Sequence, residues 1–348
     1  MNKKKIGNSD LSVSSLCLGT MTYGETTSQE DAHLQINEAI DQGINFIDTA
    51  EMYPTCPIRA ETTGNTETII GNWIKNNKSK RDNIVLATKI VGKGFSYVRN
   101  GEAINKDNIE LALDHSLRRL NTEYVDLYQL HWPNRGSYHF RKYWDYNPKR
   151  IDLKNIKEEI YSQLNCLHNL KKKGKIRAIG LSNETCWGAT LYANIAKEFE
   201  DFFITSIQNE YSLMCRIYDT DLNEFSINEN VPLLAYSPLA RGLLTGKYLN
   251  NKIPKNSRLS RDDKILKIVN ERSTKAVRDY IDLSIKYDLD PVHLSLAFCS
   301  QRPFMGSVIF GATDIFQLRR ILKGKDINLS QEVIKDINEL YKKHPLTF

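Results

Sequence analysis

Four polar side chains could together carry out a proton transfer. They lie at or just beyond the ends of short apolar runs, and they are Asp48, Tyr53, Lys89 and His131. A free tyrosine phenol titrates near pH ~10, but a neighbouring ammonium favours the phenolate and lowers the pKa. A buried lysine needs a counter-charge to stay protonated, and Asp48 would supply it. A histidine can orient a carbonyl oxygen beside the phenol or help relay its proton. These residue types predict that Tyr53 donates a proton and that Asp48 holds the lysine that tunes it.

Each residue also has an ordinary structural interpretation. Asp48 could cap a loop or the following helix, and Tyr53 could be a surface aromatic residue. Lys89 could belong to a structural ion pair, and His131 could be a satisfied core histidine. The catalytic interpretation depends on finding all four in order at consecutive strand ends.

The order of elements predicts a closed (β/α)8 barrel. Short apolar runs rich in β-branched residues recur at 14–21, 44–50, 83–90, 125–132, 176–183, 205–212, 231–239 and 307–313. Amphipathic segments lie between them, such as the one that carries Ile109, Leu113 and Leu117 at helical spacing. Many of the runs are apolar throughout, as expected for parallel strands covered on both faces. In such a barrel the four polar residues, with Asn183 and Gln208 on later strands, meet above the barrel mouth.

A doubly wound sheet is the main alternative. That fold would normally carry G-x-G-x-x-G after its first strand, but here the first strand is followed by GTMTYGETT. A linker, repeat or low-complexity tract that would mark a second domain is also missing from the sequence. We therefore expect a single barrel domain over residues 1–348.

Three kinds of segment surround the expected barrel. Residues 3–14 contain a turn-like Gly-Asn-Ser-Asp between extended stretches and predict a small hairpin. The stretch 329–344 predicts an amphipathic C-terminal helix capped by Ser330. Connections 91–106, 133–155 and 240–270 are longer than usual, and such loops are usually functional or disordered. The middle connection is rich in aromatic residues, which suits a binding wall.

Composition excludes several classes of protein. The net charge of +6, from 48 basic and 42 acidic residues, is mild, so lysine clusters at 3–5 and 171–173 indicate solvated faces rather than a nucleic-acid site. The N-terminus lacks the apolar stretch of a signal peptide, and the sequence has no run long enough to span a membrane. The six cysteines show no metal-like spacing, so we expect reduced thiols, no metal site and a cytoplasmic location.

Several motifs in family order resemble the aldo-keto reductases, in the branch with Tas-like oxidoreductases and potassium-channel β-subunits. They are LCLGTMTYGE, INFIDTAEMYP, ATKI, VDLYQLHWP, KIRAIGLSNE, IQNEYSL, LLAYSPLARGLLTGKY and FGATDIFQL. The resemblance implies an NADP(H)-dependent barrel that reduces aldehydes and ketones. Its catalytic tetrad falls on the four residues already singled out, with Tyr53 as general acid and His131 orienting the carbonyl.

The resemblance also implies a set of cofactor-binding residues. Thr20 and Met21 would lie near the nicotinamide ribose, and Asp48 would also belong to the cofactor-binding residues. At the nicotinamide end, the carboxamide would be held by Ser182, Asn183 and Gln208, and Tyr236 would lie beneath the ring. The pyrophosphate would be bound by Ser237, Pro238, Leu239, Ala240, Gly242 and Leu243. The 2′-phosphate would pair with Lys247 and Arg258, and the adenosine would be flanked by Gly311, Thr313 and Gln317.

The chain departs from the family pattern in two places. The family often has an asparagine four residues after Gln317 that reads the adenine edge, and here that residue is Ile321, so Arg320 or a nearby acidic side chain would have to substitute. Pro54 follows Tyr53 where many members have glycine, and the loop 54–66 is longer than in compact reductases. These differences affect adenine recognition and substrate range.

Two functions from different classes follow. The first is a carbonyl reductase with a small-molecule substrate, which the complete tetrad favours. The second is a regulatory protein of the channel β-subunit type, which would keep the barrel and cofactor but act by binding a partner. A homo-oligomer is compatible with both.

Overall fold

The structure is a computed structural model that describes residues 1, 3–55, 57–261 and 268–347. Eight of its strands, β3 to β10, pair in parallel and close into a barrel in the order β10-β3-β4-β5-β6-β7-β8-β9. The barrel strands are β3 (Leu16–Gly19), β4 (Phe46–Asp48), β5 (Val85–Ile90), β6 (Val125–Leu130), β7 (Ile176–Ser182), β8 (Ile204–Glu210), β9 (Leu233–Tyr236) and β10 (Met305–Phe310). The predicted (β/α)8 barrel is confirmed.

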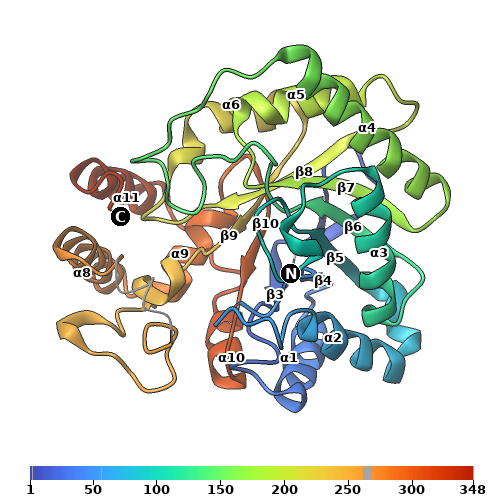
Figure 1. Cartoon of the computed structure of the whole chain (residues 1–348). Coiled ribbons are helices and arrows are strands. Elements are labelled where there is room, and N and C mark those ends of the chain that lie inside the picture. The colour runs from blue at the N-terminus through green and yellow to red at the C-terminus, as the bar shows by residue number, and fades with distance from the viewer. Residues whose placement is uncertain (2, 56, 262–267, 348) are drawn as a thin grey trace.

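Helices surround the barrel on its outside (Figure 1). The α-helices are α1 (Gln29–Asp41), α2 (Asn65–Asn76), α3 (Lys106–Leu120), α4 (Leu153–Lys172), α5 (Cys186–Ala196), α6 (Asp221–Glu229), α8 (Glu271–Lys286), α9 (Pro291–Ser300), α10 (Ile315–Lys323) and α11 (Gln331–Lys343). Short 3-10 helices are η1 (Lys78–Asn83), η2 (Arg99–Gly101), η3 (Ile217–Asp219), η4 (Ala240–Thr245) and η5 (Leu249–Asn251). The predicted amphipathic spacing is real, because Ile109, Leu113 and Leu117 of α3 are buried.

The predicted N-terminal hairpin is also present. Strands β1 (Lys3–Lys5) and β2 (Ser12–Ser14) pair antiparallel. Ile6, Leu11 and Val13 of this segment belong to one buried cluster with side chains from inside the barrel, among them Phe46 and Val85. The hairpin therefore packs against the end of the barrel at which the strands begin, and leaves the carboxyl ends of the strands for the long loops.

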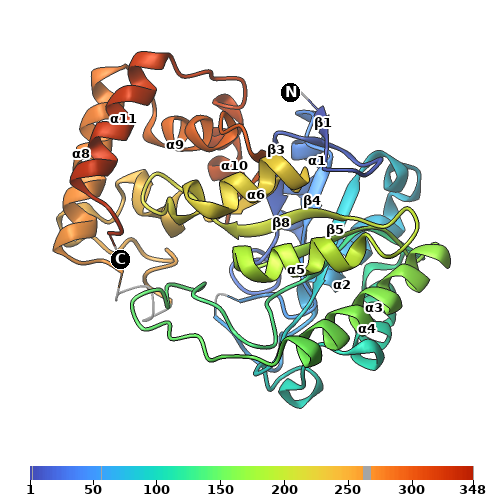
Figure 2. The same ribbon diagram turned by 90° about the horizontal axis from the view of Figure 1, so that it is seen from above.

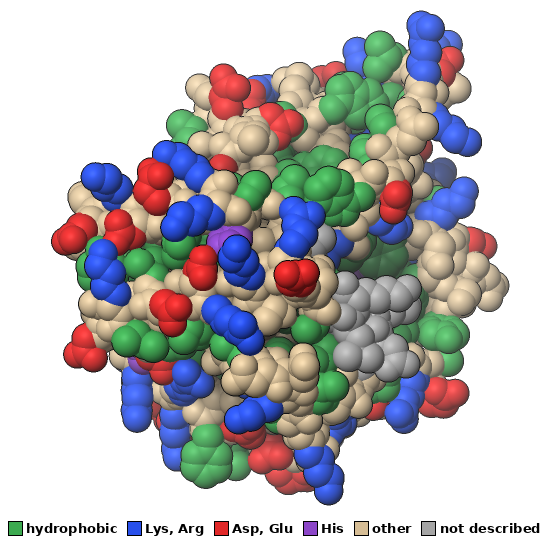
Figure 3. Space-filling model, turned by 90° about the vertical axis from the view of Figure 1, so that its left-hand side faces the viewer, with side chains coloured by type: hydrophobic (Ala, Val, Ile, Leu, Met, Phe, Trp, Pro, Cys, Tyr) green, Lys and Arg blue, Asp and Glu red, His purple; other side chains and the backbone are tan. Residues whose placement is uncertain are grey.

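The C-terminal helix packs outside the barrel, as predicted. Helix α11 begins after Ser330, whose hydroxyl accepts a hydrogen bond from the backbone N–H of Val333. It lies beside α8 (Figures 1 and 2). Acidic and basic side chains intermingle on the face seen in Figure 3, as expected for a solvated surface.

Two further observations bear on the sequence predictions. Within the described ranges no helix combines the length and apolar character needed to cross a membrane. Cys17, Cys166, Cys215 and Cys299 are buried free thiols and Cys186 is a partly exposed one, whereas Cys56 lies outside the described residues.

Candidate functional site

Strand alternation explains why polar side chains point into the barrel. On β4, Phe46 belongs to the interior cluster and Ile47 to the outer core, so Asp48 again faces inward. On β5, Ala87 faces the interior and Lys89 follows it by two residues. The residues next to the interior apolar layer, toward the loops, therefore form a polar layer.

Asp48 and Lys89 form a buried ion pair. The Nζ atom of Lys89 lies 2.7 Å from Oδ2 of Asp48 and 2.6 Å from the carbonyl oxygen of Thr49, and the two side chains are 0% and 3% exposed. Burial alone would lower the pKa of Lys89, but the carboxylate of Asp48 more than compensates and the pKa is raised. The lysine is therefore an ammonium at neutral pH.

Two amides occupy the other oxygen of the same carboxylate. Gln208 donates to Oδ1 of Asp48 at 2.9 Å, and Gln129 donates to it at 3.2 Å. The sequence patterns did not identify Gln129 as a site residue. It lies two residues after Leu127 of the interior cluster, and strand alternation therefore makes it face inward. The hydrogen bonds to the carboxylate of Asp48 all come from barrel side chains, and the helix that follows Asp48, α2, has no side-chain cap, which excludes the capping interpretation.

Tyr53 and His131 come together above this layer. The ring of Tyr53 lies 5.1 Å from Nζ of Lys89, and its centroid lies 5.9 Å from that of His131 at an interplanar angle of 76°. Burial raises the pKa of Tyr53, and the opposing effect of Lys89 is too small to reverse it. Burial and the charge of Lys89 hold the pKa of His131 well below its usual range. The site therefore pairs a protonated phenol with a neutral imidazole.

The residues proposed for the nicotinamide end are linked across three strands. The hydroxyl of Tyr236 donates to Oδ1 of Asn183 at 2.7 Å, and Nδ2 of Asn183 donates to the carbonyl oxygen of His131 at 2.9 Å. Ser182 donates to the backbone oxygen of Gln208 at 2.9 Å. Tyr236 thus has a fixed position next to the tetrad. Thr20, beside β4, is buried and donates to the backbone oxygen of Asp48, while Met21 is partly exposed.

The segment after β9 has an unusual backbone. Ser237, Ala240, Arg241 and Gly242 have positive φ angles of 56°, 47°, 58° and 95°. Residues other than glycine rarely adopt this left-handed backbone conformation, and it recurs where a protein binds a ligand closely. Backbone turns of this kind present N–H groups to an anion. The segment, which includes Pro238, Leu239 and Leu243, fits a pyrophosphate group.

Two basic residues, Lys247 and Arg258, follow this segment in the sequence. Lys247 folds back toward Gly242, where a Cβ atom would lie 3.3 Å from Nζ. The Nε atom of Arg258 is buried and lacks a hydrogen-bond partner among the described residues. Arg258 also acts electrostatically on Tyr53, whose pKa it lowers slightly against the larger effect of burial. A buried guanidinium N–H without a partner, on a side chain that is otherwise partly exposed, fits an anionic ligand.

The end proposed for adenosine is more exposed. Gln317 donates to the hydroxyl of Thr313 at 2.8 Å, close to Gly311. Ile321 is 3% exposed and packs in the core. Arg320, suggested as a substitute at this position, instead makes a two-point ion pair with Asp290 at 2.8 and 3.0 Å.

Three buried ion pairs around the mouth were missed in the sequence. Each joins an arginine of a loop to a glutamate at a strand end: Arg99 to Glu51, Arg135 to Glu184, and Arg141 to Glu210. Arg99 reaches both carboxylate oxygens of Glu51, at 2.6 and 2.7 Å. A glutamate just beyond each strand end was the available signal, since a charge there needs a partner.

The aromatic connection, residues 133–152, is anchored on the site. The hydroxyl of Ser137 donates to the backbone oxygen of Asn183 at 2.9 Å, and Nε2 of His139 lies 2.9 Å from the backbone oxygen of Glu184. Trp144 reaches helix α8, where its ring lies 6.0 Å from the guanidinium of Arg272. In Figures 1 and 2 this segment extends from β6 toward α8 and α11. The connection is a wall fixed to β7 and β8.

Acid should destabilise this wall. Burial lowers the pKa of His139 to about 4 from 6.5, so between these values the unfolded chain binds more protons than the folded one. The free energy of unfolding should therefore fall as the pH drops from about 6.5 toward 4, by on the order of 3 kcal/mol from this residue. Urea unfolding across this pH range measures it. His139→Gln should make the profile less steep, with the contribution of His131, whose pKa is also lowered, still present. The control His115→Gln should leave the profile unchanged, and a wild-type profile in His139→Gln would contradict the assignment.

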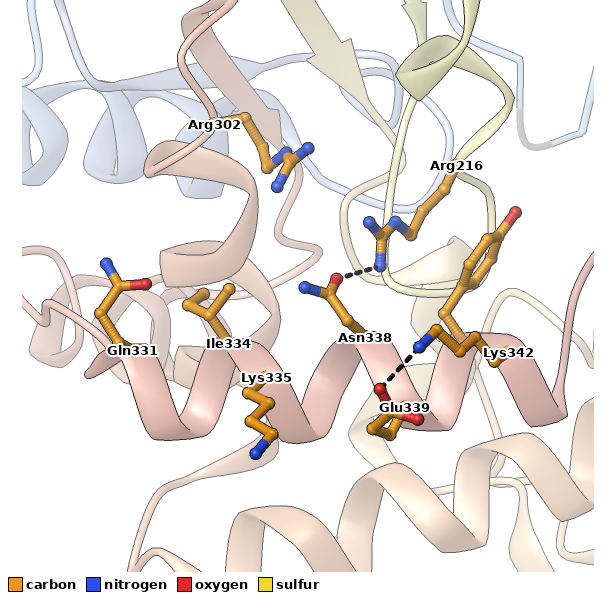
Figure 4. Close-up of a pocket in the computed structure, with 9 residues that line it drawn as sticks. Arg216, Arg302, Gln331, Ile334, Lys335, Asn338, Glu339 and Lys342 are labelled. Atoms are coloured by element: carbon orange, nitrogen blue, oxygen red, sulfur yellow. Dashed lines mark hydrogen bonds and ion pairs between the residues drawn. The ribbon is translucent and has the colours of Figure 1, made fainter.

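Other parts of the surface do not share this chemistry. Among the described residues, three or more His, Cys, Asp or Glu side chains do not gather as a metal site would require. A groove of about 550 Å3 runs along α11 (Figure 4), lined by Arg216, Arg302 and residues of that helix. Arg216 is engaged there by Asp219 at 2.6 Å and Asn338 at 2.9 Å, so it docks the helix.

Comparison with known proteins agrees with the geometry. The model of the aldo/keto reductase family matches residues 15–342. Protein tas of Escherichia coli (strain K12) is 40% identical over 348 residues, which cover 98% of each chain. The NADH-specific methylglyoxal reductase of E. coli is 27% identical and covers 95% of each chain. A probable voltage-gated potassium channel subunit beta of Arabidopsis thaliana is 26% identical over 99% of this chain and 98% of its own. The predicted resemblance is thereby confirmed: the chain belongs to the aldo/keto reductase family of oxidoreductases.

Proposed function

We propose that the protein is an NADPH-dependent reductase of aldehydes and ketones. The observation that carries the proposal is the buried Asp48–Lys89 pair at 2.7 Å, whose ammonium lies 5.1 Å from the centre of the Tyr53 ring. When bound, NADPH would supply the hydride to the carbonyl carbon. Tyr53 would donate its proton to the carbonyl oxygen, and the ammonium of Lys89 would stabilise the phenolate that remains.

The other residues would position the reactants. The neutral imidazole of His131 would orient the carbonyl oxygen beside the phenol. Ser182, Asn183 and Gln208 would hold the carboxamide, with Tyr236 under the ring. The backbone of the segment formed by Ser237, Pro238, Leu239, Ala240, Gly242 and Leu243 would bind the pyrophosphate through N–H groups.

A regulatory protein of the channel β-subunit type is the second candidate, favoured by the similarity to the Arabidopsis protein. NADPH oxidation in the presence of a panel of aldehydes and ketones discriminates the two. We expect catalytic turnover with several of these carbonyl compounds. Cofactor binding without turnover of any member would favour the regulatory candidate. The small-molecule substrate, the cytoplasmic location, the lack of a nucleic-acid or membrane partner and a homo-oligomeric state all stay proposals.

The preference for NADPH over NADH should depend on two cations. A relative is named as NADH-specific, so the family alone does not decide the nucleotide. Lys247 and Arg258 would pair with the 2′-phosphate through charge-assisted contacts, and NADPH should bind about 10–100-fold more tightly than NADH. Fluorescence titration with both nucleotides measures this. Lys247→Met and Arg258→Met should each weaken NADPH binding more than NADH binding, and equal affinity of the wild-type protein for both would contradict the assignment.

A further inference from the structure

Arg241 is a cation at the barrel mouth that the proposed reaction does not use. Its Nε atom is buried, and neither a hydrogen bond nor an ion pair of its side chain is found within the described parts of the chain. It lies in the segment after β9 with a φ of 58°, in the left-handed region. The side chain as a whole is only partly buried, but a buried guanidinium N–H without a partner is costly, and an anionic ligand would remove that cost.

The surroundings of Arg241 leave it with excess positive charge. The carboxylate that acts on it is that of Glu210, which already accepts a hydrogen bond from Arg141 at 2.5 Å. Burial and the guanidinium of Arg141 lower the pKa of Arg241, and Arg258 lowers it further. Among the described residues, the carboxylate of Glu210 is thus shared by Arg141 and Arg241, and Arg258 adds a further positive charge near Arg241.

The position of Arg241 points to the substrate rather than the cofactor. Its guanidinium acts electrostatically on Tyr236, the proposed platform of the nicotinamide ring, and on Glu210 at the end of β8. Arg141 reaches Glu210 from the aromatic connection that walls the mouth. The dinucleotide phosphates already have proposed partners in the backbone of 237–240 and 242–243 and in Lys247 and Arg258, so the side chain of Arg241 is left over. An anion beside Arg241 would therefore lie at the nicotinamide end, where the carbonyl substrate has to bind.

We propose that Arg241 binds the anionic group of the substrate, so that the enzyme selects aldehydes or ketones that also carry a carboxylate. The proposal rests on the proposed reductase function and specifies its substrate class. Arg241 acts on specificity and not on the chemical step, since Tyr53 and His131 handle the carbonyl.

The kinetic test compares aldehydes that carry a terminal carboxylate, at increasing chain length, with their methyl esters. We expect the wild-type enzyme to prefer the acids. Arg241→Met should lower kcat/KM for the preferred acid by about 10–100-fold and leave that for the ester nearly unchanged, while Arg241→Lys retains part of the preference. Arg118→Met, which removes an exposed arginine of α3, is the matched control. Loss of acid and ester activity together with NADPH affinity would instead place the guanidinium on the cofactor pyrophosphate and overturn the proposal.

A binding test separates this proposal from the reductase function. The wild-type protein with bound NADP+ is titrated with butyrate and with butyramide, its neutral analogue, by calorimetry. Tighter binding of butyrate, lost in Arg241→Met and at high salt, is expected even if none of the aldehydes is reduced. Equal binding of both compounds to the wild-type protein overturns the anion site, whether or not the Arg241 variants fold.

Discussion

Tyr53→Phe should lower kcat for aldehyde reduction by at least about 10²–10⁴-fold, the usual contribution of a general acid. The change removes the only proton that the phenol can give and leaves the aromatic ring against Lys89 and His131 in place. NADPH affinity should persist, because the phenol contributes to the transition state and not to cofactor binding. Stopped-flow reduction and NADPH titration on the same preparation measure the two quantities.

The matched control for this variant is Tyr161→Phe. Tyr161 is an exposed tyrosine of α4 and packs against Phe199, away from the mouth. It should reduce aldehydes at the wild-type rate. Near-normal aldehyde reduction by a folded, NADPH-binding Tyr53→Phe protein would refute the general-acid role.

Lys89→Met should impair both catalysis and folding. It leaves the carboxylate of Asp48 buried without its counter-charge, and breaking such a pair typically costs about 3–5 kcal/mol. The fall in kcat should be comparable to that of Tyr53→Phe, because the phenolate would lose its cation. The two effects should not add in the double variant, since both act on one proton transfer.

A second substitution separates stability from chemistry. In Lys89→Met with Asp48→Asn the uncompensated charge is gone, so the free energy of unfolding from urea denaturation should recover while kcat stays low. Asp48→Asn alone should reduce kcat less than Lys89→Met. If kcat recovered together with stability, Lys89 would be a structural residue only.

The sequence was sufficient for the barrel and for the direction of its polar side chains. Strands that are apolar on both faces and alternate with helical segments are compatible with few folds other than the barrel. The alternation of side chains along each strand, with a period of two residues, places Asp48 and Lys89 inside the barrel. The N-terminal hairpin and the C-terminal helix followed from turn and capping residues, which act locally. The tetrad and cofactor residues stay predictions for experiment, although the structure brings Asp48, Tyr53, Lys89 and His131 together.

The sequence was insufficient where a partner lies far along the chain. Arg99 and Glu51, or Arg141 and Glu210, have no shared periodicity, so only the folded chain reveals the pairing. The sequence also could not show which of two opposing effects on the pKa of Tyr53 is larger. The ammonium of Lys89 acts on Tyr53 in the expected direction, but the extent of burial, which raises the pKa of Tyr53 overall, depends on the loops.

The carboxylate of Asp48 has a consequence for how this enzyme could change. It lies on β4 and receives bonds from Lys89 of β5, Gln129 of β6 and Gln208 of β8. Four of the eight barrel strands are therefore linked to each other through the carboxylate that we propose prepares the proton donor. Variation that alters this chemistry would weaken the scaffold at the same time, whereas variation at exposed residues of the connection 133–152, such as Trp144, or at the side chain of Arg241 should weaken it less. New substrate specificities should therefore arise by changes in the loops around the barrel mouth, while Asp48 and the side chains bonded to it stay unchanged.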